Sequence, residues 1–168
     1  MAAPCFIAYN AAMPTSAPPA HANVGTSLTR VVLQIVPSTT KKIRIVEWGY
    51  TFAVAPANNV RMELLDAGAT YATGLTAHVS SGVAPYNDAN GGTSTVQLGT
   101  ALTGHGVINA SAPSAVRPLA YQYENGLYFK QQFPLGREPE IAAGNACWVR
   151  VTTAASAVDV STYVIWEE

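Results

Sequence analysis

Hydrophobic and polar residues alternate along most of this chain with a period of two, the pattern of β-strands whose two faces lie in different environments. In the clearest run, Ile43 and Ile45 share one face, whereas Trp48 and Tyr50 form the apolar face further along. The buried phase therefore switches close to Val46. A β-bulge, or a strand that passes from one environment to another, produces such a switch.

Nine strands are predicted in this way, and clusters of Gly, Asn, Asp and Pro separate them as turns. Apolar spacing typical of an amphipathic helix is almost absent. This pattern predicts an all-β protein: an antiparallel β-sandwich with jelly-roll or Greek-key connections and about eight to nine strands, with a barrel as the second choice. The predicted strands are residues 28–36, 41–54, 59–65, 71–79, 93–98, 116–123, 128–133, 147–153 and 158–166. The predicted core is Ile43, Ile45, Trp48, Tyr50, Val60, Met62, Leu64, Val149, Val151, Val160 and Val164.

The first 23 residues differ from the rest, because prolines interrupt the alternation. Prolines lack the amide proton of a β-ladder and favour an extended path. We predict an extended N-terminal arm over residues 1–23 and a single β-sandwich domain over residues 24–168. The short apolar stretch at residues 5–9 is expected to leave its own domain and dock on a neighbour. The expected contact residues are Phe6, Ile7, Tyr9, Pro18 and Pro19.

Charge is sparse in this sequence. Nine Lys and Arg oppose ten Asp and Glu, and charged residues make up 11% of the 168 residues, against about 25% in a typical soluble domain. The chain therefore lacks the basic face that nucleic acids and anionic membranes select, and neither partner is expected. The N-terminus has no basic segment followed by a continuous apolar one, so the protein is expected to be made in the cytoplasm. Cys5 and Cys147 are expected to be free thiols rather than a disulfide.

A search for reactive side chains finds no motif for catalysis or for a cofactor. His21, His78 and His105 lack the spacing and the companion ligands of a zinc motif. Glu138 and Glu140 flank a proline and are interpreted as a charged loop tip rather than an acid–base pair. We therefore expect no enzymatic activity, no cofactor and no metal site.

Most aromatic residues lie within predicted strands and are expected in the core or at a subunit interface. Tyr86 instead precedes the polar turn at residues 87–92 and is the best candidate for an exposed ring on which a sugar could stack. A carbohydrate-binding module is therefore the alternative to a purely structural protein.

Four stretches of sequence carry a resemblance: residues 41–50 (KKIRIVEWGY), 83–88 (VAPYND), 132–140 (QFPLGREPE) and 163–168 (YVIWEE). Together they resemble small virion proteins encoded among the head genes of tailed bacteriophages, especially phages of actinobacteria. The chain is similar to the β-sandwich capsid decoration, or cement, proteins of such phages. The resemblance covers residues 40–168 in patches and leaves the N-terminal arm uncovered.

The resemblance implies a structural role on the outer surface of the capsid, after synthesis in the host cytoplasm. The implied partners are the major capsid protein, whose subunits it would bridge, and further copies of the chain, arranged as a homotrimer. It implies neither catalytic residues nor a cofactor. The alternative function is a carbohydrate-binding β-sandwich module on the virion surface, in a head fibre or associated with the tail, with Tyr86 as the glycan contact.

Overall fold

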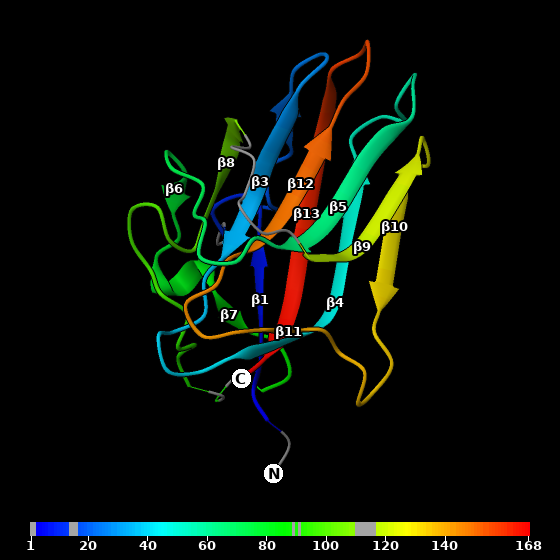
Figure 1. Cartoon of the computed structure of the whole chain (residues 1–168). Coiled ribbons are helices and arrows are strands. Elements are labelled where there is room, and N and C mark those ends of the chain that lie inside the picture. Colours follow the sequence, from blue (N-terminus) through cyan, green and yellow to red (C-terminus); the bar gives the residue numbers. More distant parts are fainter. Residues whose placement is uncertain (1–2, 14–16, 89, 91, 110–116) are drawn as a thin grey trace.

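The computed structural model describes residues 3–13, 17–88, 90, 92–109 and 117–168. Within these residues the chain forms thirteen β-strands, one 3-10 turn at Ser80–Gly82 and no α-helix. The strands build two antiparallel sheets that pack face to face (Figure 1). The predicted antiparallel β-sandwich is therefore confirmed, with more strands than the eight or nine expected.

The two sheets, called sheet A and sheet B, contain seven and six strands. Sheet A has the order β10 (Tyr128–Gln132), β4 (Ile43–Phe52), β13 (Val158–Glu167), β1 (Cys5–Tyr9) and β7 (Ala84–Pro85), with β11 (Glu140–Ile141) paired to β4 and β2 (Ala22–Val24) paired to β13. Sheet B has the order β6 (Thr76–Ala77), β8 (Gly104–Asn109), β3 (Thr29–Ile35), β12 (Cys147–Thr152), β5 (Val60–Asp66) and β9 (Arg117–Glu124).

Eight of the strands form four antiparallel pairs in a nested order. The first of the eight pairs with the last, the second with the second-to-last, and likewise for the remaining four. In chain order they are β1, β3, β4, β5, β9, β10, β12 and β13, and the pairs are β1·β13, β3·β12, β4·β10 and β5·β9. The pairs are joined within each sheet, because β13 also pairs with β4 and β12 also pairs with β5. This nesting is the connectivity of a jelly roll, a long hairpin wrapped into two layers.

The core between the sheets contains every residue that the alternation placed there. All eleven predicted core residues are at most 3% exposed. Of the two explanations for the phase switch near Val46, the structure shows the β-bulge: Ile165 lies opposite Glu47 and Trp166 lies opposite Ile45, which leaves Val46 as the extra residue. The extra residue moves the core-facing side of β4 from odd-numbered to even-numbered positions.

A second, smaller core lies on the outer side of sheet B, beneath the segments that precede β8. Trp148 points outward from β12 and is covered there by Ala72 and Leu75. Gln34 fixes this cover, because its Oε1 accepts hydrogen bonds from Trp148 Nε1 (2.6 Å) and from the Ala72 backbone N–H (2.8 Å). Its amide nitrogen donates to the Leu102 carbonyl (2.7 Å). A fully bonded amide can be buried at little cost, so this polar group stabilises the cover.

Two predicted strands are wrong in whole or in part. Residues 71–79 contribute only the two residues of β6, and residues 93–98 form no strand. In the second segment, the Thr95 N–H donates to the Glu168 carboxylate (2.7 Å) and the Gln97 N–H donates to the Val36 carbonyl (2.8 Å). These bonds replace a β-ladder, and alternation alone could not distinguish the two arrangements.

A strand that the alternation did not predict, β8, contains two glycines, Gly104 and Gly106. Gly104 pairs with Ala77, and a Cβ atom at Gly104 would lie only 2.6 Å from the Thr76 carbonyl oxygen. The glycine therefore permits close approach of β6 to β8 rather than a chain reversal.

The prediction of an N-terminal arm that leaves its own domain is wrong for residues 5–9. β1 lies between β13 and β7 in its own sheet and pairs with both. Phe6 is buried in the core and its ring lies 6.3 Å from that of Trp166. Burial of this side chain and a backbone ladder on both sides hold the strand in its own domain. Cys5 in this strand and Cys147 in the core are both free thiols, as expected.

The prolines interrupt a ladder instead of leading away from it. β1 pairs with residues 163–167 of β13, and β2 continues in the same direction along residues 158–160. Of the described residues between these strands, 11–13 and 17–21 form no strand, and among them Pro18 is exposed and Pro19 half-buried. Pro14 lies outside the described residues.

We expect truncation of Leu64 to alanine to lower the free energy of unfolding by about 2–5 kcal/mol, because Leu64 is completely buried in the main core. Leu135→Ala is the matched control, since Leu135 is 91% exposed and should change stability by less than about 0.5 kcal/mol. Chemical denaturation of both variants measures the difference. Equal stabilities would show that β5 is misplaced.

Candidate binding surface on sheet A

The four stretches that carry the resemblance lie side by side at one end of sheet A, where β1 begins and β13 ends (Figure 1). Residues 41–50 lead into and form most of β4, which lies between residues 132–140 on one side and residues 163–168 on the other. Residues 83–88 join this surface through β7 and β1. We call the outward side of sheet A the A face. Its side chains include Tyr9, Arg44, Glu47, Thr51, Tyr128, Lys130, Ser161, Tyr163 and Glu167.

A groove of about 340 Å³ crosses the A face and is lined mainly by aromatic rings. The rings of Tyr9 and Tyr163 lie 5.8 Å apart at the groove, and Tyr128 beside them is 76% exposed. Gly49 makes room for this arrangement, because a Cβ atom there would lie 2.8 Å from the Tyr163 ring. The result is a broad, shallow and largely apolar surface, which suits another surface better than a small reactive substrate.

A buried carboxylate anchors the groove. Glu47 accepts a hydrogen bond from the Tyr163 hydroxyl (2.6 Å) and forms an ion pair with Lys130 Nζ (3.1 Å). Burial raises the pKa of the Tyr163 phenol well above its ordinary value, and the hydrogen bond to Glu47 raises it further. Burial, followed by the proximity of Tyr86, also raises the pKa of Tyr9. Both phenols therefore remain neutral at physiological pH.

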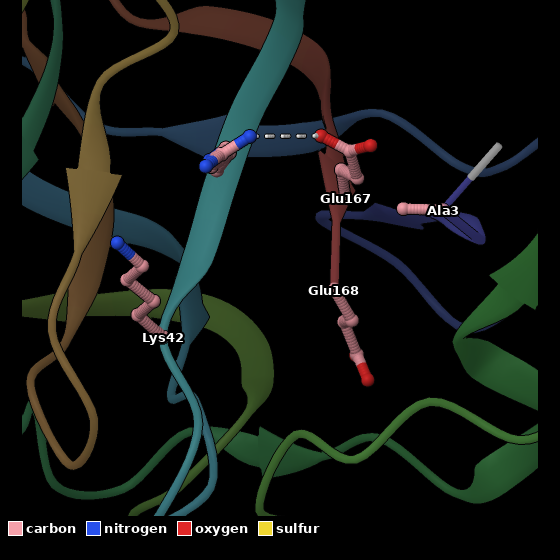
Figure 2. Close-up of a pocket in the computed structure, with 5 residues that line it drawn as sticks. Ala3, Lys42, Glu167 and Glu168 are labelled. Carbon is pink, nitrogen blue, oxygen red and sulfur yellow. Dashed lines mark ion pairs between the residues drawn. The ribbon is translucent and has the colours of Figure 1, made fainter.

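A charged pocket of about 240 Å³ lies at the end of the A face (Figure 2). The Glu140 carboxylate forms ion pairs with Lys42 Nζ (2.7 Å) and Arg44 Nε (3.2 Å). Arg44 also forms a longer ion pair with Glu167 (3.9 Å). The hydrogen bond from Lys42, supported by Arg44, lowers the pKa of the Glu140 carboxyl. Glu140, interpreted from the sequence as part of a charged loop tip, instead lies in β11 and pairs with the start of β4. A carboxylate held ionised in this way is a poor general acid.

The last residue of the chain has a structural role in this pocket. Glu168 points away from Glu167 (Figure 2), and its carboxylate binds the segment that follows the polar turn. It accepts hydrogen bonds from the Ser94 hydroxyl and from the Thr95 N–H and hydroxyl, the latter two at 2.7 Å. Burial alone would raise the pKa of Glu168, but these hydrogen bonds, with one from Trp166 Nε1, lower it overall.

Two histidines that are distant in sequence meet near this sheet. The rings of His78 and His105 lie 4.8 Å apart, and a His78 ring nitrogen contacts the Tyr9 carbonyl at 2.9 Å. Burial lowers the pKa of His78 to about 4, and His105 adds to this effect, while the contact with Tyr9 opposes it. Burial also lowers the pKa of His105. Sequence spacing could not reveal this pair, because the fold brings β8 to the loop after β6.

The structure separates the contact residues predicted from the sequence. Phe6 and Ile7 are buried within their own domain and are unavailable to a partner. Tyr9 lines the groove on the A face, and Tyr86 lies close enough to influence the pKa values of Tyr9 and Tyr163. Tyr86 is exposed, as expected. Pro18 and Pro19 lie outside the two pockets of the A face.

Comparison of the chain with known protein families, with curated proteins and with solved structures found no match. Among the residues that the structure describes, no three His, Cys, Asp or Glu side chains are grouped so that they could hold a metal ion. The described part of the chain also contains no helix long and apolar enough to cross a membrane.

We expect the free energy of unfolding to fall as the pH is lowered from 6.5 to 4. In this range His78 becomes protonated in the unfolded chain, where its pKa is about 6.5. In the folded chain the pKa of His78 is about 4, so the side chain stays largely neutral. The difference between the two pKa values corresponds to a loss of up to about 3 kcal/mol at the lower pH. Urea denaturation at several pH values measures the slope.

The control for this prediction is His78→Gln, which keeps a polar side chain near Tyr9 but cannot titrate. It should show a shallower loss of stability between pH 6.5 and 4. An identical slope in the two proteins would contradict the assignment to His78.

Proposed function

We propose that this protein is a structural protein of a tailed-bacteriophage virion, which decorates and stabilises the capsid from its outer surface. It would bridge subunits of the major capsid protein and would act without a cofactor or an enzymatic activity. The observation that carries the proposal is the position of the four stretches that resemble capsid decoration proteins. They are scattered in the sequence but adjacent in sheet A, where they supply Arg44, Glu47, Tyr163 and Glu167 to the A face.

The chemistry of the A face supports a protein partner. Protein interfaces combine an apolar, aromatic centre with a polar rim. Here the groove with Tyr9, Tyr128 and Tyr163 provides the centre, and the ion pairs around Arg44 and Glu140 lie at its end. Tyrosines account for a large share of the binding energy in many interfaces, and Tyr128 is the exposed one of these three.

The open edges of the sandwich support self-association as a homotrimer. Within the described residues, β10 and β9 lie at one edge of sheets A and B, and the short strands β7 and β6 lie at the other edges. Unpaired strand edges are usually covered or blocked in a soluble protein. Subunits arranged in a ring would cover these edges, and three linked A faces would bind the capsid more tightly than one through multivalency. Because binding favours the assembled capsid, it would also stabilise it.

We expect the protein to bind capsids of the phage that encodes it after they have been depleted of this protein, and Tyr128→Ala to weaken the binding at least about tenfold. Tyr128 lines the groove and is highly exposed, so its removal should leave the fold intact. Co-sedimentation over a range of protein concentrations measures the affinity.

Tyr121→Ala is the matched control, since Tyr121 is an exposed tyrosine on the outer side of sheet B. It should bind capsids within about twofold of the unaltered protein. Absence of binding by the unaltered protein would refute the proposed function. Equal binding by Tyr128→Ala would refute the assignment to the groove.

We also expect the protein to have three times the mass of one chain in sedimentation equilibrium at micromolar concentration. The open edges at β9 and β10 provide the physical reason, because a closed ring would bury them. A single-chain mass throughout the concentration range would contradict the homotrimer, and the capsid experiment would then test decoration by a monomer.

A further inference from the structure

The outer side of sheet B is only partly covered. The second core occupies one half of it, and the other half exposes side chains of β12, β5 and β9 in two cross-strand rows. We call this open half the B platform. Its members are Thr152, Arg61 and Tyr123 in one row and Arg150, Glu63 and Tyr121 in the next.

Two aromatic rings form one margin of the B platform. Tyr121 and Tyr123 are two residues apart on β9, so they lie on the same face at a spacing of about 6.7 Å. They are 54% and 57% exposed, and neither hydroxyl has a hydrogen-bond partner within the described part of the chain. Tyrosine rings presented in this way offer an apolar face with a polar edge, which suits the C–H face of a sugar ring and its neighbouring hydroxyls.

A polar pocket of about 300 Å³ adjoins the two rings. Asn59, Arg61 and Thr152 line it together with the tyrosines. Arg61 Nη2 donates to Thr152 Oγ1 at 3.2 Å, which fixes the guanidinium in place. Its Nε atom is buried without a hydrogen-bond acceptor. This is the one such side-chain atom among the described residues, so Arg61 is positioned but incompletely bonded.

The charges of the B platform do not cancel. Glu63 accepts two hydrogen bonds from Arg150, at 2.8 and 3.1 Å, and also lies 3.4 Å from Arg61 Nε. One carboxylate therefore faces two guanidinium groups, which leaves an excess positive charge. The Arg61 side chain is the more exposed of the two, at 38% against 16% for Arg150. A planar guanidinium in this state favours a carboxylate as its partner.

We propose that the B platform binds an acidic oligosaccharide. Sugar rings stack on Tyr121 and Tyr123, a carboxylate on the sugar pairs with Arg61, and Asn59 is placed to bond a hydroxyl. The chain has a net charge of only −1, so a polyanion gains no general attraction and the recognition is local. This site lies on the opposite layer from the A face and does not depend on the function proposed for that face.

The test uses the full-length protein on an array of immobilised oligosaccharides, in which each chain containing uronic acid has a neutral counterpart of equal length and linkage. We expect acidic chains to retain the protein and their neutral counterparts to retain it at least tenfold less. Titration calorimetry with the best acidic chain should show about tenfold weaker binding for Arg61→Gln and for Tyr123→Ala. Tyr123→Phe should restore most of the affinity, because it keeps the stacking ring.

Tyr128→Ala is the control on the opposite face and should bind the acidic chain with unchanged affinity. Binding should also weaken as the salt concentration rises from 50 to 500 mM, since the ion pair between Arg61 and the sugar carboxylate would be exposed to solvent. Retention of acidic and neutral chains alike would overturn the role of Arg61. Absence of retention by any oligosaccharide, or unchanged affinity in Tyr123→Ala, would overturn the site, whatever the result with capsids.

Discussion

The pairing of the first strand with the last is the constraint on which the rest of this structure depends. β1 and β13 form the outermost pair of the nested jelly roll, and β13 in turn pairs with β4. Asn10 closes this pairing, since its amide donates to the Val160 carbonyl (3.0 Å) and its oxygen accepts from the Thr162 N–H (2.7 Å). Without β1, the ladder of β13 would lose one side and the core beneath Trp166 would open. Residues 5–9, which were expected to form an external arm, are thus part of the nested strand pairs of the jelly roll.

Each strand of the nested pairs contributes side chains both to the core and to an outer surface, because successive side chains point to opposite faces. In β13, Val164 and Trp166 fill the core while Tyr163 and Glu167 belong to the A face. The two layers therefore present independent outer faces with different chemistry. The A face is aromatic and nearly neutral at its centre, which supports a protein partner. The B platform combines exposed rings with an excess guanidinium, which supports an acidic sugar.

Buried polar groups fix how these layers are assembled. Gln34 fastens the cover of the second core, and Glu47 holds Tyr163 and Lys130 at the groove. Tyr50 donates to Glu124 at 2.6 Å and so links β4 of sheet A to β9 of sheet B. Each is bonded to specific partners, and a bonded buried group disfavours other arrangements of the strands. His78 differs from these groups, because burial lowers its pKa and favours the neutral imidazole.

The sequence by itself determined the fold class, the main core and the bulge in β4, because a strand that faces a core and a solvent must alternate. It could not determine which strands are neighbours, since alternation is the same beside any partner. Tertiary structure alone therefore decided that β1 stays in its own sheet, that residues 104–109 form a strand, and that His78 meets His105. It also decided that Tyr121 and Tyr123 are exposed beside Arg61, although aromatic residues in the predicted strands were expected in the core or at an interface. Cross-strand registers place Tyr123 and Thr152 beside Arg61 in the B platform and Tyr9 and Gly49 beside Tyr163 on the A face, and these long-range contacts created both surfaces.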